Sequence, residues 1–596
     1  MKLKKIKKNT IDISGTNVGL NGIRRRIKTV FALICLVFLT VVIRDFYLQT
    51  IKNEFLAEQA SRQYRREIEI KARRGKIFDR NYYSLAVSVD CDSVFAVPSK
   101  VADIESTADI LSRLLSLDKE SVIKKLSQKR EFVWIKRKIS EEESVRLRRR
   151  NLRGIGFIKE SKRFYPQECL ASQLLGFTGV DNEGLEGVER EFDEYIAGKS
   201  GIKVITEKDA KGGSPFIYEK PVTDGDNVVL TIDKNIQFIV QSELEKGVKF
   251  AEAKSGMAIV VDPANGDILA MANYPGFNPN KRNNYSPSTW RNRIVTDCFE
   301  PGSVFKIVFA CAAIEKGIVM PDSEIDCSPG FIVVGGRKIR DSHPHNMLTF
   351  TEVLEKSSNV GSIKIAQLLG ENELYKYIRK FGFGEKTGIQ LQGEARGILR
   401  KPKDWSLVSI GAITIGQEIA VTPLQLAMAY SAIANGGLLL KPRIAKRIES
   451  WDGEIKKVFP PVTVRRVISE RTAHILRGIL KTVVSEEGTA HLARIEGFEV
   501  AGKTGTAQKA ENGAYQPGKY YSSFIGIVPA DAPRFVIAVI LDEPKKNHYG
   551  GIVSAPIFRE IAKRSLLYCG VKPHKEDGKL RLVVADAVNK KEERNL

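Results

Sequence analysis

The chain has 596 residues, a formal net charge of +23, 43% hydrophobic residues and 28% charged residues. This length predicts two to four domains, and the composition excludes a wholly disordered protein. The positive charge is compatible with nucleic acid, an anionic membrane surface or an anionic polymer as a partner. The seven cysteines show no CxxC pair and no metal-ligand spacing, which argues against a disulfide framework and a zinc site.

The N-terminus predicts a membrane anchor. Residues 1–28 carry nine Lys or Arg against one acid, and an uncharged stretch, "TVFALICLVFLTVVI", follows at 29–43. Fifteen residues are short for a span of ~20, but snorkelling of Lys28 and Arg44 can lengthen the helix. A cleaved signal peptide would need small residues at a cleavage site, and "VVIRDFYLQ" has none. A buried core helix is the alternative.

We therefore expect an uncleaved, single-pass anchor at 29–48 with a basic cytoplasmic tail at 1–28. By the positive-inside rule, everything after the anchor then lies outside the cell membrane. This placement argues against nucleic-acid binding, for which the sequence also has no recognised motif.

Residues 49–225 are strongly charged and predict a mixed α/β domain. Short alternating runs such as "SVFAVPS" are typical of strands, and "SEEESVRLRRRN" is typical of an exposed helix. The stretch 228–248 predicts a strand that leads into a long helix.

From residue 226 to 570 we expect a second domain of the α+β class. "GMAIVVDPANGDILAMAN" at 256–273 predicts a hairpin, and so does "YSSFIGIVPADAPRFVIAVILDE" at 521–543. The region 300–440 between them is mostly helical. Two hairpins at the ends of a helical middle predict one antiparallel sheet covered by helices. Residues 571–596 are a short charged tail.

Ser303 and Lys306 are candidates for a nucleophile and its base. Residues three apart on a helix are neighbours, and a helix N-terminus offers free N–H groups to a developing negative charge. Burial beside other cations would lower the pKa of the lysine. Taken alone, the pattern favours a helix cap with a solvated lysine, because Ser-x-x-Lys also occurs at Ser116, Ser121 and Ser200.

Two later motifs strengthen this hypothesis. Ser357 and Asn359 lie two residues apart just before a helical run. "VAGKTGTA" places Lys503, Thr504, Gly505 and Thr506 at the end of a short apolar strand, and on an edge strand these groups can face a cleft. Similar tripeptides begin at Lys199, Lys254 and Lys386.

The three motifs, in this order, resemble the S-x-x-K, S-x-N and K-[ST]-G signature of penicillin-binding proteins and serine β-lactamases. "RRGKIFDRNYYSLAVS" at 73–88 is similar to the motif that follows the anchor in class B penicillin-binding proteins, with Tyr82 in place of the usual glycine. "GFTGVDNEGLEGVE" at 176–189 looks more like the division-specific members than their elongation relatives. The resemblance implies a pedestal domain at 49–225 and a transpeptidase domain at 226–570.

The resemblance also implies the role of each residue. Ser303 is the acyl nucleophile and Lys306 its base, Ser357 shuttles the proton, and Asn359 positions Lys306 and the substrate amide. The donor carboxylate binds Lys503 and the Thr506 hydroxyl, with Thr504 and Gly505 beside them. The backbone N–H groups of Ser303 and Thr506 form the oxyanion hole.

The implied activity is D,D-transpeptidation of peptidoglycan stem peptides, inhibited by β-lactams, without a metal or organic cofactor. The implied partners are the membrane, a SEDS-family glycan polymerase and other division proteins. Alternatives on the same fold are an elongation-type transpeptidase, a D,D-carboxypeptidase and a β-lactamase. A penicillin-sensing receptor is the non-enzyme alternative, but 28 cytoplasmic residues cannot form a signalling domain.

Overall fold

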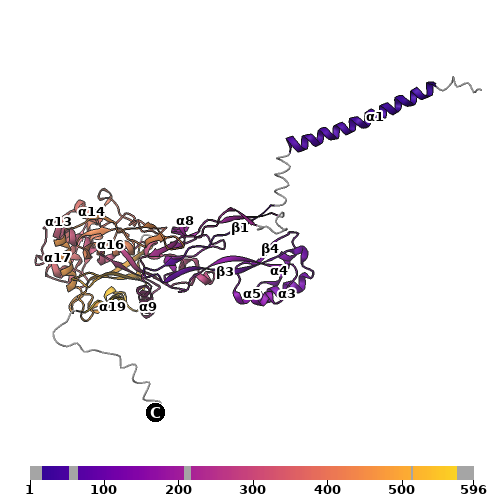
Figure 1. Cartoon of the computed structure of the whole chain (residues 1–596). Coiled ribbons are helices and arrows are strands. Elements are labelled where there is room, and N and C mark those ends of the chain that lie inside the picture. The colour runs from indigo at the N-terminus through magenta and orange to yellow at the C-terminus, as the bar shows by residue number, and fades with distance from the viewer. Residues whose placement is uncertain (1–16, 53–64, 207–215, 512–513, 574–596) are drawn as a thin grey trace, which may run out of the picture. The chain divides into compact units, whose positions relative to one another are not determined.

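The structure is a computed structural model that describes residues 17–52, 65–206, 216–511 and 514–573. Residues 1–16 of the expected cytoplasmic tail and 574–596 of the expected C-terminal tail lie outside this description. The chain forms two compact units (Figure 1). We call Met1–Ile70 with Ser200–Val222 the anchor unit, and Lys71–Lys199 with Thr223–Leu596 the main unit.

The anchor unit contains a long helix and a small sheet. Helix α1 covers Asn17–Phe46 and continues as one π-helical segment, η1, over Tyr47–Ile51. Among the described residues, one segment, Gly22–Ile51, is long and apolar enough to cross a membrane. The helix is therefore longer than the expected anchor at both ends. Strands β1 (Arg65–Ile70), β6 (Gly201–Thr206) and β7 (Phe216–Lys220) form an antiparallel sheet with β6 in the centre.

The main unit is organised around a five-stranded antiparallel sheet of order β10-β9-β21-β20-β19. Both expected hairpins are confirmed: β9 (Ser255–Asp262) pairs with β10 (Asp267–Tyr274), and β20 (Ala514–Val528) pairs with β21 (Phe535–Asp542). Every residue of β9 and of β21 is buried, because helices cover both faces of the sheet. Strand β19 (Ala501–Glu511) forms one edge.

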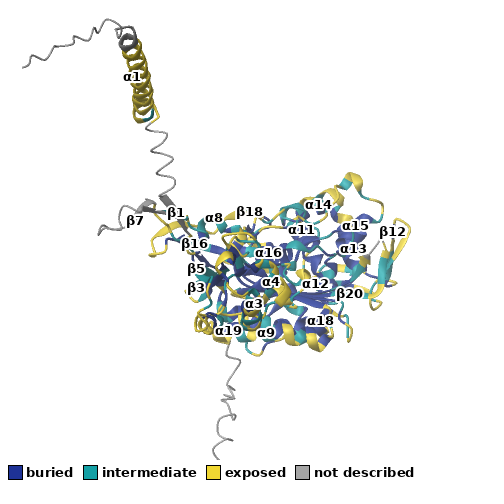
Figure 2. Ribbon diagram, turned by 90° about the vertical axis from the view of Figure 1, so that its right-hand side faces the viewer, coloured by how far each residue is buried: buried dark blue, intermediate teal, exposed yellow. Residues whose placement is uncertain are grey.

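Helices from both ends of the domain cover this sheet. Helix α9 (Lys234–Ala251) packs against β9 and β10, and α19 (Ala555–Tyr568) packs against α9 and β21. The two helices lie side by side in Figures 1 and 2. Helix α16 (Pro423–Ala434) also contacts β9 and β21, and all twelve of its residues are buried. Its N-terminus is fixed by a capping box between Thr422 and Gln425.

The helical middle of the domain carries the site. Its larger helices are α11 (Ile307–Glu315), α12 (Phe350–Glu355), α13 (Asn359–Leu369), α14 (Glu371–Lys380), α15 (Ser409–Thr414) and α17 (Glu470–Thr482). Helix α11 contacts α13, α14 and α17, and eight of its nine residues are buried (Figure 2). Three small two-stranded sheets lie at the periphery of this unit: β11 (Glu324–Asp326) with β14 (Met347–Thr349), β12 (Phe331–Val334) with β13 (Arg337–Arg340), and β15 (Leu438–Leu440) with β18 (Thr463–Arg466).

A second large sheet joins segments from far apart in the sequence. Its order is β17-β16-β8-β2-β3-β4, and β5 (Ile155–Phe164) also pairs with β3. The other members are β2 (Ile77–Phe78), β3 (Ser84–Ala96), β4 (Val133–Lys136), β8 (Asn227–Leu230), β16 (Ala445–Glu449) and β17 (Ile455–Val458). The expected boundary at 225–226 therefore falls within one continuous sheet.

A small helical layer packs on the far end of this second sheet. It consists of α3 (Ile104–Leu115), α4 (Lys119–Leu126) and α5 (Glu141–Arg148), which share a separate apolar core with β3 and β4. Helix α5 has the expected position, and Ser140 and Glu143 form a capping box at its start. Of the Ser-x-x-Lys repeats found here, Ser116 ends α3 and Ser121 lies in α4, both exposed to solvent.

Candidate active site

Ser303 lies in a short 3-10 segment, η6 (Gly302–Lys306), that leads directly into α11. Two long-range hydrogen bonds fix this segment. The Gly302 N–H donates to the Gly416 carbonyl (3.1 Å), and the buried Tyr430 hydroxyl donates to the Val304 carbonyl (2.9 Å). Ser303 itself is half-buried, and its hydroxyl makes no hydrogen bond to any described residue. The hydroxyl is therefore left available to a ligand.

Lys306 is completely buried, one turn after Ser303. Its Nζ donates to the carbonyls of Ser357 (2.7 Å) and Ser358 (3.1 Å) and to Asn359 Oδ1 (2.9 Å). It also lies 3.5 Å from Ser357 Oγ. The Lys306 amine therefore joins the Ser-x-x-Lys motif to the Ser-x-Asn motif, whose residues lie 51 to 53 positions further along the chain.

Lys503 approaches the same place from the edge strand β19. Its side chain is also completely buried, and its Nζ donates to Ser357 Oγ at 2.9 Å. Ser357 has a left-handed backbone (φ 58°) between α12 and α13, which is uncommon for a non-glycine residue and is often found at functional sites. Its hydroxyl accepts hydrogen bonds from two lysines.

Burial changes the protonation of both lysines. It lowers the pKa of Lys306 to about 7, although the negative charge of Asp341 opposes this shift. Burial also lowers the pKa of Lys503 well below its usual value, and the nearby charge of Lys306 lowers it further. A neutral lysine amine can accept a proton, so the site can supply a base near neutral pH.

Asp341 is a residue of this site that the sequence analysis missed. Its carboxylate accepts hydrogen bonds from Ser358 Oγ (2.7 Å), from the Val360 N–H (3.0 Å) and from the Asn359 N–H. The preceding carbonyl, of Arg340, accepts from Asn359 Nδ2 (2.9 Å). Asp341 therefore holds the first turn of α13 in place. Nothing in the local pattern around it marks this role, because the contact joins segments about 18 residues apart.

Glycine at 505 is required by packing within the protein. A Cβ there would lie 2.4 Å from Ser523 Oγ and 3.0 Å from the Pro301 carbonyl. A Cβ on Gly302 would lie 3.2 Å from the Thr506 carbonyl. Strand β19 therefore runs directly against the segment that carries Ser303.

The two threonines of the third motif have different surroundings. Thr504 is buried, and its hydroxyl lies 3.1 Å from that of Thr489. The Thr506 hydroxyl is partly buried and accepts a hydrogen bond from the Gly550 N–H (3.3 Å). The similar tripeptides elsewhere have no such setting: Lys386 is exposed in a turn, and Lys254 pairs with Glu543.

A helix-covered antiparallel sheet with a Ser-x-x-Lys turn, a Ser-x-Asn turn and an edge-strand lysine defines the class of penicillin-binding proteins and serine β-lactamases. Residues 256–563 match the family model "Penicillin binding protein transpeptidase domain", and 69–230 match "Penicillin-binding Protein dimerisation domain". The chain belongs to the class B penicillin-binding proteins and is a peptidoglycan D,D-transpeptidase of that family.

Relatives match nearly the whole chain. Stage V sporulation protein D of Bacillus subtilis is 38% identical over 93% of this chain and 87% of its own length. The peptidoglycan D,D-transpeptidase FtsI of Escherichia coli is 33% identical over 91% of this chain and 92% of its own length. A crystal structure of penicillin binding protein 3 from Mycobacterium tuberculosis, complexed with aztreonam, is 31% identical with a TM-score of 0.68, covering 85% of this chain and 98% of that one.

Proposed function

We propose that this transpeptidase acts through a serine acyl-enzyme on Ser303. The observation that carries the proposal is the convergence of two buried lysines on the Ser357 hydroxyl, beside a serine whose own hydroxyl is unbonded in the described structure. Lys306, with a pKa of about 7, is the base that this arrangement favours.

The acylation step would proceed as follows. Ser303 Oγ attacks the carbonyl carbon of the donor D-Ala-D-Ala bond, and its proton passes to the Lys306 amine. The C–N bond then breaks, and the proton moves through the Ser357 hydroxyl to the leaving D-Ala amine. The short path between Lys306 and Ser357 supports this transfer.

In the second step, the amine of a neighbouring stem peptide attacks the ester carbonyl and gives up a proton. That proton restores the Ser303 hydroxyl, and a new amide replaces the ester. Thr506 and Lys503 are the candidates for binding the donor carboxylate. The nearness of Thr506 to Gly302 supports an oxyanion hole between the N–H groups of Ser303 and Thr506.

We further propose that the chain is anchored with its N-terminus in the cytoplasm and its main unit outside the membrane. The helix over Gly22–Ile51 and the nine basic residues of 1–28 support this orientation. The septal role, with a SEDS-family polymerase and other division proteins as partners, is supported by the division-type motif at 176–189 and by relatives named FtsI.

Labelling with a fluorescent penicillin tests the acyl-enzyme. We expect Ser303→Ala to abolish covalent labelling while the protein stays folded, and Lys306→Ala to slow labelling by ~10²–10⁴, the range of base catalysis. Peptide mapping of the wild type should find the adduct on residue 303. An adduct on Ser116, Ser121 or Ser200 would overturn the assignment.

A fluorescent fusion at the cytoplasmic end tests the septal role. We expect the signal to gather at midcell in dividing cells. Signal along the side wall would favour an elongation enzyme, and signal only during spore formation would favour the role named in the sporulation relative.

A further inference from the structure

A basic pocket lies in the main unit between segments of the two family regions. Its volume is about 330 Å³, near the lower end of ligand sites. The wall includes five cationic residues: Lys138, Lys162, Arg163, Lys281 and Arg282. None of the described residues that line it is acidic.

Two of these cations, Lys138 and Arg282, are held in place by uncharged partners, so they keep the pocket positive. Lys138 Nζ donates to Asn182 Oδ1, which is an uncharged acceptor. Arg282 Nη1 donates to the Thr178 carbonyl (2.9 Å), and its guanidinium lies 4.7 Å from the centre of the Phe177 ring. These side chains need little reorganisation to receive a ligand.

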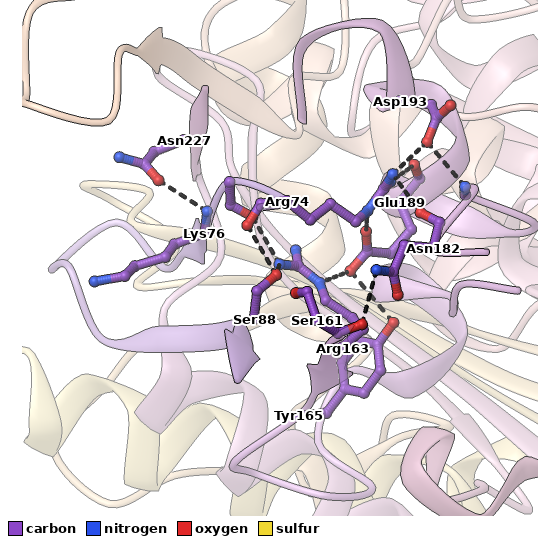
Figure 3. Close-up of polar contacts among 12 residues, drawn as sticks. Arg74, Lys76, Ser88, Ser161, Arg163, Tyr165, Asn182, Glu189, Asp193 and Asn227 are labelled. Atoms are coloured by element: carbon purple, nitrogen blue, oxygen red, sulfur yellow. Dashed lines mark hydrogen bonds and ion pairs between the residues drawn. The ribbon is translucent and has the colours of Figure 1, made fainter. Parts of the chain in front are cut away.

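Arg163, which also lines the pocket, is buried in a cluster of charged side chains (Figure 3). Its Nε donates to Glu189 (2.6 Å), and its Nη1 donates to the Gly75 carbonyl (2.7 Å). Arg74 approaches Glu189 as well, with Nε at 2.8 Å, and also contacts Asp193. The charge of Arg163 is therefore balanced within this cluster, and the excess positive charge of the pocket comes from the four other cations.

The remaining two cations have no partner of opposite charge. Within the described part of the chain, neither Lys162 nor Lys281 forms an ion pair or a side-chain hydrogen bond. Glu160, the acid on the same strand as Lys162, is engaged by Arg137 instead. Burial, and further the charges of Arg137 and Lys71, lower the pKa of Lys138, while Glu160 opposes the shift. The unpaired charges of Lys162 and Lys281 favour a bound anion.

We propose that this pocket is an anion site that binds an oxyanion group of peptidoglycan. The ligand would be either the diphosphate of a lipid-linked precursor or the carboxylates of a stem peptide, which share the oxygen chemistry that lysine and arginine recognise. The first part of this proposal, that the pocket binds an anion, rests on the pocket alone. Its source in the cell wall rests on the proposed placement of the main unit outside the membrane.

Calorimetry on the purified full chain in detergent, with inorganic pyrophosphate as the probe, tests the site. We expect saturable binding that weakens as salt is added. The double variant Lys162→Ala/Lys281→Ala should bind about tenfold or more weakly, since it removes the two unpaired charges. The control Lys403→Ala/Lys563→Ala removes two exposed lysines outside the pocket and should bind like the wild type.

Competition identifies the source of the oxyanion. Displacement of pyrophosphate by a short prenyl diphosphate supports the lipid-linked precursor, and displacement by a phosphate-free muropeptide supports the stem carboxylates. Penicillin labelling of Ser303 should be unchanged in the Lys162/Lys281 variant, which separates this site from the proposed mechanism. The proposal is overturned if the wild type shows no saturable binding, or if both double variants lose affinity equally.

Discussion

Lys306 and Lys503 meet at a single hydroxyl: their Nζ atoms lie 3.5 Å and 2.9 Å from Ser357 Oγ. Both side chains are fully buried, on segments about 200 residues apart. Burial lowers the pKa of each lysine, and the charge of Lys306 lowers that of Lys503 further. The protonation of this pair should control the chemistry at Ser303.

The first prediction concerns the pH dependence of acylation. In the proposed mechanism the neutral form of Lys306 is the base, and burial lowers the pKa of Lys306 to about 7. The rate of penicillin acylation should therefore fall about tenfold for each pH unit below 7 and reach a plateau above it. Stopped-flow labelling across this range measures the profile, with the melting temperature recorded at each pH as the control for folding. A flat profile on the acid side would show that Lys306 is not the base.

The second prediction concerns Asp341, a positioning residue. Its charge raises the pKa of Lys306, so Asp341→Asn should move the midpoint of the acylation profile to lower pH. The rate on the plateau should fall about tenfold or more, because the carboxylate also holds the first turn of α13 through charge-assisted hydrogen bonds.

The matched control is Asp322→Asn, which removes an exposed acid from the same region. That variant should keep both the rate and the midpoint. If Asp341→Asn lowered the rate but left the midpoint in place, Asp341 would act on α13 only and not on the protonation of Lys306.

The third prediction concerns the contact between β19 and the Ser303 segment. Gly505→Ala places a methyl group 2.4 Å from Ser523 Oγ and 3.0 Å from the Pro301 carbonyl, so the Ser523 side chain must turn and the strand and the Ser303 segment must separate slightly. Acylation should become very slow, and the melting temperature should fall. Gly478→Ala is the control, because nothing lies within 4 Å of a Cβ there and alanine favours the helix α17 that contains it. Full acylation in Gly505→Ala would show that the strand can shift without disturbing the site.

The fourth prediction concerns Tyr82, which stands where the family pattern has glycine. The backbone keeps the left-handed conformation that glycine favours (φ 65°), at a cost of about 1–2 kcal/mol for other residues. The Tyr82 hydroxyl donates to Glu449 Oε1 at 2.7 Å, and this contact offsets part of that cost. Tyr82→Ala removes the hydrogen bond to Glu449 and keeps the strained backbone conformation. Tyr82→Gly removes both the hydrogen bond and the strain.

We therefore expect Tyr82→Gly to melt at a higher temperature than Tyr82→Ala. Tyr82→Phe, which keeps the ring and removes only the hydroxyl, should melt below the wild type. Equal melting temperatures for the glycine and alanine variants would mean that the turn relaxes when the ring is removed.

The sequence predicted the helices and strands of this fold better than the tertiary contacts between them. Both hairpins and the helical character of 300–440 follow from local patterns of apolar residues and turn residues. The contact of Lys503 with Ser357 spans 146 residues, and the role of Asp341 depends on a turn brought to α13 by the β12–β13 hairpin. Such contacts depend on tertiary packing, which no local pattern records. The motifs indicated which residues form the site, whereas tertiary packing determines the contacts between those residues.

The last prediction concerns the lifetime of the penicillin adduct. Hydrolysis of an ester on Ser303 needs a water molecule aligned with its carbonyl and a base to activate that water. In class A β-lactamases a glutamate is the base for deacylation. In this chain the candidate for such a base is Glu300, three residues before Ser303.

The surroundings of Glu300 argue against that role. Its Oε1 accepts hydrogen bonds from the Glu418 N–H (2.8 Å) and from the Tyr515 hydroxyl (3.3 Å), and its Oε2 is buried without a partner among the described residues. Burial raises the pKa of this carboxyl, which makes it harder to ionise. The carboxyl is tied to the 416–418 segment and is unsuited to activating water.

We therefore expect the penicilloyl ester on Ser303 to persist for many minutes, and Glu300→Gln to change its lifetime by no more than a few-fold. The measurement is to acylate the purified protein, remove free drug and follow the adduct by intact mass. Loss of the adduct within seconds would favour a β-lactamase. A strongly prolonged adduct in Glu300→Gln would instead identify Glu300 as a hydrolytic base. If neither occurs, the ester waits for a peptide amine, as the cross-linking reaction requires.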